Sequence, residues 1–71
     1  MSDAERIDAI VAACREVQAR IEACGRKCDE FMLERIGMRF EWAIFRGTNI
    51  NDAIEQVAAG YVPVARQLLS A

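Results

Sequence analysis

The sequence predicts an all-α protein, a small three-helix bundle, and three observations support this fold class. Apolar residues recur at helical spacing through the first 46 residues, without a competing strand-like alternation. Pro, Ser, Thr and Asn are all absent between Asp3 and Arg46, whereas residues 47–51 gather turn-forming residues. The chain has 71 residues, 54% of them apolar, and a net charge of −2, which excludes disorder and predicts a single helical domain over 1–71.

The first predicted helix covers about residues 3–24. Ser2 and Glu5 match the capping box that opens many helices. A heptad repeat follows, and its register continues past Gly25 with Arg35 as its only charged member. The positions of this repeat are Ile7, Ile10, Cys14, Val17, Ile21, Cys24, Cys28, Phe31, Arg35, Met38, Trp42 and Phe45.

Two interpretations of this repeat remain open. The unbroken register allows one long helix over 3–46, with a C-terminal helix folded back on it. That helix would be about 65 Å long, and it could not bury its apolar positions without a second chain. Alternatively, Gly25 ends the first helix, because glycine is favoured just past a helix end, and Asp29 caps the next. We favour the turn, which gives a second helix over about 28–46.

The third predicted helix covers about residues 50–70. It begins after Gly47, with Asn49 or Asn51 as its cap. Proline in a helix interior costs about 3 kcal/mol. We therefore expect a break or kink near Gly60–Pro63, with Pro63 at the first position of a resumed helix.

The segment 29–46 is apolar on most sides, which is more than a helix of a small monomeric bundle can bury. An exposed apolar remainder marks an interface. We therefore expect the protein to form a homodimer through this segment, in which Arg35 would pair with a glutamate of another helix and fix the register. The candidate interface consists of Phe31, Met32, Ile36, Met38, Phe40, Trp42 and Phe45.

The chain contains no histidine, so it lacks the usual general base and the commonest metal ligand. We expect no enzymatic activity, no catalytic residues, no cofactor and no metal. The three cysteines follow the apolar repeat, where a thiol acts as a small hydrophobe. The alternative is a thiol-based redox or metal sensor at Cys24 and Cys28, because the neighbouring Arg26 and Lys27 would lower the pKa of the thiols.

The other function classes receive less support from the sequence. Residues 38–60 resemble a helix-turn-helix, but acidic residues open its second helix, which is unfavourable beside phosphates. A small helical nucleic-acid-binding regulator is therefore a further alternative, and the chain has no membrane-spanning stretch. No motif is specific enough to indicate a family. The sequence predicts a cytoplasmic protein–protein interaction module, an adaptor, regulator or inhibitor that binds itself and an unidentified protein.

Overall fold

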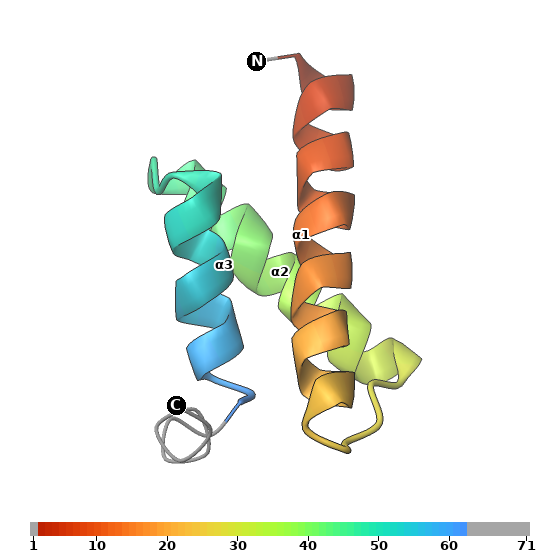
Figure 1. Ribbon diagram of the computed structural model, residues 1–71. Coiled ribbons are helices and arrows are strands. Elements are labelled where there is room, and N and C mark those ends of the chain that lie inside the picture. The colour runs from red at the N-terminus through yellow and green to blue at the C-terminus, as the bar shows by residue number, and fades with distance from the viewer. Residues whose placement is uncertain (1, 63–71) are drawn as a thin grey trace.

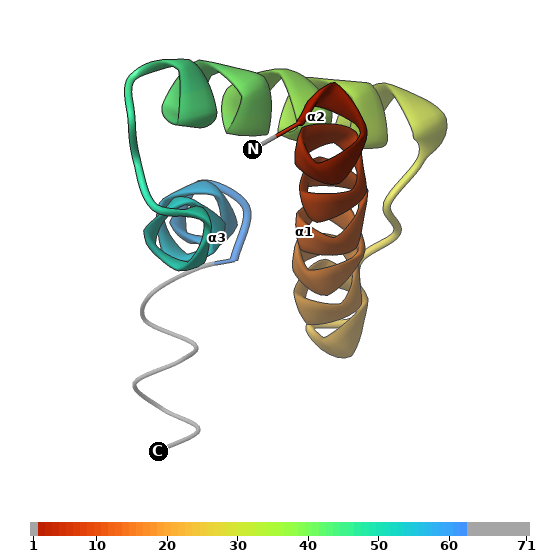
Figure 2. The ribbon, with the colours of Figure 1, turned by 90° about the horizontal axis from the view of Figure 1, so that it is seen from above.

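Three helices pack together in the computed structural model, which describes residues 2–62. They are α1 (Asp3–Ala23), α2 (Glu30–Phe45) and α3 (Ile50–Ala59) (Figure 1). Each helix contacts both of the others. Seen from above, α2 lies across one side of the molecule, and α1 and α3 lie together on the other side (Figure 2). The predicted three-helix bundle is confirmed.

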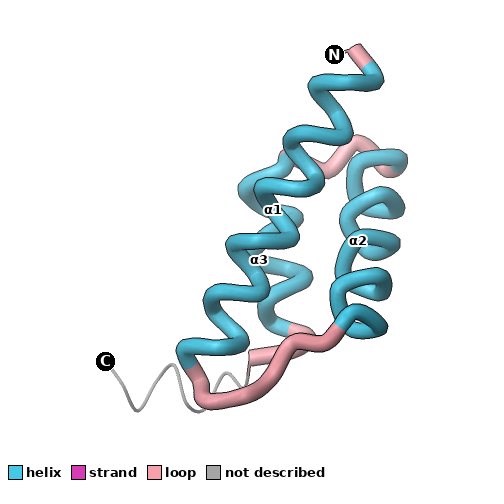
Figure 3. The backbone as a smooth tube through the Cα atoms, turned by 90° about the vertical axis from the view of Figure 1, so that its right-hand side faces the viewer, coloured by secondary structure: helices cyan, strands magenta, loops and turns pink. Residues whose placement is uncertain are grey.

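The chain turns at Gly25, so the alternative of one long helix over 3–46 is wrong. Gly25 has φ = 81°, a left-handed conformation that favours glycine. Its N–H donates to the carbonyl oxygen of Glu22 at 2.9 Å, and the N–H of Arg26 donates to that of Ile21 at 3.3 Å. These bonds satisfy carbonyl groups at the end of α1. The loop then passes under the bundle to α2 (Figure 3).

Glycine-to-alanine substitutions should have opposite effects at two positions. A Cβ atom on Gly25 would meet no atom within 4 Å, so Gly25→Ala should lose stability only through its left-handed backbone, by about 1–2 kcal/mol. Gly37 lies inside α2, and a Cβ atom there would make an ordinary 3.9 Å contact with the Cys14 sulfur. Gly37→Ala should therefore stabilise by up to about 1 kcal/mol. Urea unfolding of both variants tests this prediction. Changes of the same sign in the free energy of unfolding would contradict it.

Side-chain caps fix the helix starts, as the sequence predicts. Ser2 Oγ accepts from the N–H of Glu5 at 3.2 Å, and Asp29 Oδ1 accepts from that of Met32 at 2.8 Å. Asn49, rather than Asn51, caps α3.

The end of α3 agrees with the predicted break. The helix stops at Ala59, Gly60 is its C-cap, and the N–H of Val62 donates to the carbonyl oxygen of Ala58 at 2.8 Å. The predicted continuation from Pro63 to residue 70 lies outside the described residues.

The core lies where the three helices meet, and its largest fully buried side chains are Phe40, Ile21, Ile36 and Val17. The heptad positions Val17 and Ile21 of α1 face this core. The heptad positions of α2 do not, because the turn at Gly25 changes which side of the chain faces the bundle. The buried residues of the core are Ala13, Val17, Ile21, Ile36, Phe40, Ala43, Ala53, Val57, Ala58 and Val62.

Polar contacts join α1 and its loop to α3. Arg20 donates to Glu55 at 2.7 Å and to Glu16 at 3.1 Å. The hydrogen bond from Arg20 lowers the pKa of the Glu55 carboxyl. Arg26 donates to the carbonyl oxygen of Tyr61 at 3.0 Å, which ties the first loop to the end of α3. These contacts are exposed, so they orient the elements more than they stabilise them.

Candidate interaction surface

Four large apolar side chains lie on the side of α2 that faces away from the core, and we call them the outer face. Phe31 is 79% exposed, Met38 60%, Trp42 62% and Phe45 84%. Ile36 and Phe40, on the opposite side of the same helix, are completely buried. At about 100° per residue, the two sets are on average half a turn apart around the helix axis. The helix thus has one apolar side for its own bundle and a second that faces outward.

The seven interface residues predicted from the sequence fall into three groups in the structure. Phe31, Met38, Trp42 and Phe45 form the outer face. Met32 is half-buried against the core. Ile36 and Phe40 are completely buried in the core, so contrary to the prediction they are not available to a partner. Their burial follows from the turn at Gly25, which directs this side of α2 toward α1 and α3.

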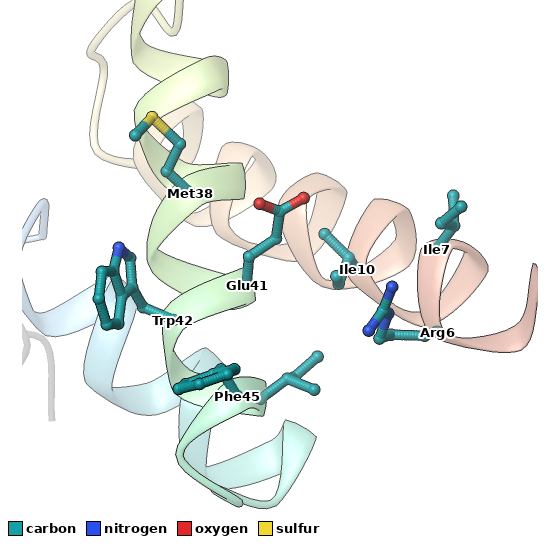
Figure 4. A pocket seen from close by; sticks show the side chains of 8 residues that line it. Arg6, Ile7, Ile10, Met38, Glu41, Trp42 and Phe45 are labelled. Carbon is teal, nitrogen blue, oxygen red and sulfur yellow. The ribbon is translucent and has the colours of Figure 1, made fainter. Parts of the chain in front are cut away.

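An open groove continues the outer face toward the start of α1. Figure 4 shows Met38, Trp42 and Phe45 on α2 with the N-terminal part of α1 beside them. Two exposed apolar residues of α1, Ile7 (56%) and Val11 (45%), were not among the interface candidates of the sequence. Ile7 lines the groove. Its place in the heptad repeat was the one sequence feature that could have identified it as an interface residue. The lining residues are Arg6, Ile7, Ile10, Met38, Glu41, Trp42, Ile44 and Phe45.

Trp42 and Phe45 contact each other on the outer face. Their ring centroids are 6.2 Å apart and their planes meet at 79°, the edge-to-face geometry that aromatic pairs favour. This contact restrains two exposed rings in the free protein. A partner would consequently lose less side-chain entropy when it covers them.

Rows of opposite charge border the outer face. On the helical projection, its acidic border consists of Glu30, Glu34 and Glu41, and its basic border of Arg35, Arg39 and Arg46. The acidic row lies toward α1, because Glu41 lines the groove with residues of that helix. The basic row lies toward the end of α3, because the Arg39 guanidinium is 5.5 Å from the centre of the Tyr61 ring.

The cysteines lie half-buried beside the core, and no disulfide joins them. Burial raises the pKa of the Cys14 thiol, and the nearby Cys28 adds to the effect. Burial also raises the pKa of the Cys28 thiol, with contributions from Glu22 and Asp29. The alternative of a thiol sensor requires Arg26 and Lys27 to lower the pKa at Cys28, and the structure gives the opposite direction.

Thiol chemistry provides a test of these pKa shifts. A raised pKa means that the folded protein holds the thiol proton more tightly than the unfolded chain. Cys14 and Cys28 should therefore react with Ellman's reagent at pH 7 more slowly than the same chain unfolded in urea. As the pH rises, the Cys14 and Cys28 thiols lose their protons in the unfolded chain before they do so in the folded protein. The free energy of unfolding should therefore fall at alkaline pH. A thiol at Cys28 that reacts faster in the folded protein would contradict this.

Metal ligands, charge and membrane-spanning character can be described for residues 2–62. No group of three or more Cys, Asp or Glu residues in this part of the chain could hold a metal ion. The outward side of α3 carries Asp52 and Glu55, and α3 itself contains no lysine or arginine. None of the described helices has the length and apolar character needed to cross a membrane. Comparisons of the chain with protein-family models, curated proteins and solved structures found no match.

Proposed function

We propose that this protein is a small, non-enzymatic helical interaction module that acts by covering a partner surface with the outer face of α2. An adaptor, a regulator and an inhibitor all work in this way. The observation that carries the proposal is the exposure of Phe31, Met38, Trp42 and Phe45 on the side of α2 opposite the core. The partners are a second copy of the chain and a further protein.

The composition of the outer face supports this proposal. Aromatic residues and methionine are enriched at protein interfaces, with arginine, and aromatic anchors carry much of the binding energy. The outer face has three aromatic residues and one methionine, with Arg35 and Arg46 at its border. Single exposed apolar residues need no explanation, but several on one side of one helix are typical of a binding site.

Neither alternative function has a comparable observation in its favour. The raised pKa values of Cys14 and Cys28 do not favour a reactive thiolate. The acidic residues of α3 do not favour contact with phosphates. Protein binding is therefore the function that we propose.

Trp42 is the only tryptophan of the chain, so its fluorescence tests the proposal directly. Acrylamide should quench Trp42 efficiently in dilute protein, and several-fold less when self-association covers it at high concentration. A Met38→Glu variant is the control: it keeps Trp42 but places a charge on the outer face, and its quenching should not change with concentration. Quenching of the wild-type protein that stays constant up to millimolar concentration would contradict self-association through this face.

A further inference from the structure

We infer that the second copy of this chain binds α2 against α2 in parallel orientation, with Glu34 and Glu41 of each copy facing Arg39 and Arg46 of the other. This inference rests on the proposed function and specifies the geometry of its homodimer. It follows from the spacing of the outer face, the charges beside it and the free side of α2.

The spacing on the outer face is that of a coiled-coil seam. With the border residue Arg35 included, steps of four and three residues alternate through Phe31, Arg35, Met38, Trp42 and Phe45. This is the a/d pattern by which two helices interlock along their length. The side of α2 that carries this pattern faces away from the bundle, because the described helices α1 and α3 lie on the other side of α2 (Figure 2).

The charges beside the seam select the orientation. In a parallel pair, the residue before each a position meets the residue five positions later on the other helix. Glu34 then faces the partner's Arg39, and Glu41 faces the partner's Arg46. The two-fold symmetry repeats both pairs on the other side. In an antiparallel pair, the acidic rows would face each other, as would the basic rows, and both contacts would be repulsive.

These charges are available for a partner. Every ion pair in the described residues is made by α1 with itself or with α3, and none involves the borders of the outer face. Glu34, Glu41 and Arg46 are exposed. Arg39 is exposed too, although its guanidinium lies over the Tyr61 ring.

Arg35 occupies an a position, which makes the pairing selective. A single charged residue in a seam lowers the affinity but specifies the register and the number of chains. In the parallel arrangement, the two copies of Arg35 lie in the same layer, which lowers the affinity, and each lies next to Glu34 of the other copy, which can neutralise it. The glutamate partner that the sequence predicted for Arg35 is thus one from the second chain.

The area of the outer face suits a reversible dimer. With buried aromatic side chains contributing ~150–250 Å² each, the exposed parts of the four residues amount to roughly 600 Å² per copy. Two copies would bury about 1,200 Å², the lower limit of stable specific interfaces. The dimer should therefore exchange with monomers and depend on concentration.

Charge reversal tests the orientation without new cysteines. A Glu34→Lys/Glu41→Lys variant should remain folded, since Glu30 and the new lysine at position 34 form a favourable i, i+4 pair. In the parallel dimer this variant places lysine opposite arginine, so its self-association should weaken at least tenfold. A matched Arg39→Glu/Arg46→Glu variant should weaken similarly. An equimolar mixture should associate again, because each acidic residue then meets a base.

Sedimentation equilibrium of each variant and of the mixture distinguishes the outcomes. Loss of association when each variant is measured alone, with recovery in the mixture, supports the parallel pair. If each variant alone associates as tightly as wild type, the pair is antiparallel. That result overturns this inference and leaves the proposed function standing. A monomeric wild type overturns both. Because Arg39 also contacts Tyr61, Glu41→Lys mixed with Arg46→Glu repeats the test without changing Arg39, and failure of that mixture to recover would contradict the pairing.

Discussion

Phe40→Ala should destabilise the protein severely. Phe40 is completely buried and is the largest such side chain in the core. Removal of a buried phenylalanine leaves a cavity and typically costs about 3–5 kcal/mol. A chain of this length has a total stability of about 4–11 kcal/mol. The loss is therefore a large part of the free energy of unfolding, and helical circular dichroism during urea titration should show an early transition or none.

Phe45→Ala is the matched control for that experiment. It removes the same side chain from the same helix, at a position that is 84% exposed. In dilute protein, where a dimer is dissociated, its stability should change by less than about 1 kcal/mol. Similar losses for the two variants would contradict the assignment of opposite sides of α2 to core and surface.

Trp42→Glu should remove self-association and leave the folded monomer intact. Trp42 is 62% exposed and is not among the core residues, so its loss should change the monomer little. In the parallel dimer, two glutamates would meet at this a position within an apolar interface, in place of two aromatic anchors. Truncation of such an anchor commonly costs 2 kcal/mol or more. We expect the dissociation constant to rise at least about a hundredfold.

Gln56→Glu provides the control for added charge. It introduces the same negative charge at an exposed position of α3, away from the outer face. Sedimentation of this variant should match that of wild type. A Trp42→Glu protein that dimerises as wild type does, or a Gln56→Glu protein that fails to dimerise, would place the interface elsewhere.

Local signals in the sequence were sufficient to predict the fold. Ser2, Asp29 and Asn49 cap the three helices, and a cap depends only on residues a few positions away. Gly25 ends α1 by adopting a backbone conformation that other residues rarely take. The break after Ala59 also follows from nearby residues, since Gly60 and Pro63 both disfavour a continuous helix.

The core side of α2 could not be predicted from these signals. The heptad through Met38 and Trp42 is as regular as the true core positions Ile36 and Phe40, so periodicity alone cannot choose between the two sides. The choice depends on the direction of the chain after Gly25, which is a tertiary property. The same limit applies to the thiols. Arg26 and Lys27 are neighbours of Cys28 in sequence, but burial with Glu22 and Asp29 determines the direction of its pKa shift.

The measurement that tests the central claim most directly is the mass of the wild-type protein in solution by sedimentation equilibrium, from micromolar to millimolar concentration. The monomer has a mass of 7.9 kDa. If the outer face of α2 is a binding surface for a second copy, the mass should rise toward twice this value, and a Trp42→Glu protein should stay at the monomer mass. A wild-type protein that remains monomeric throughout would contradict the account.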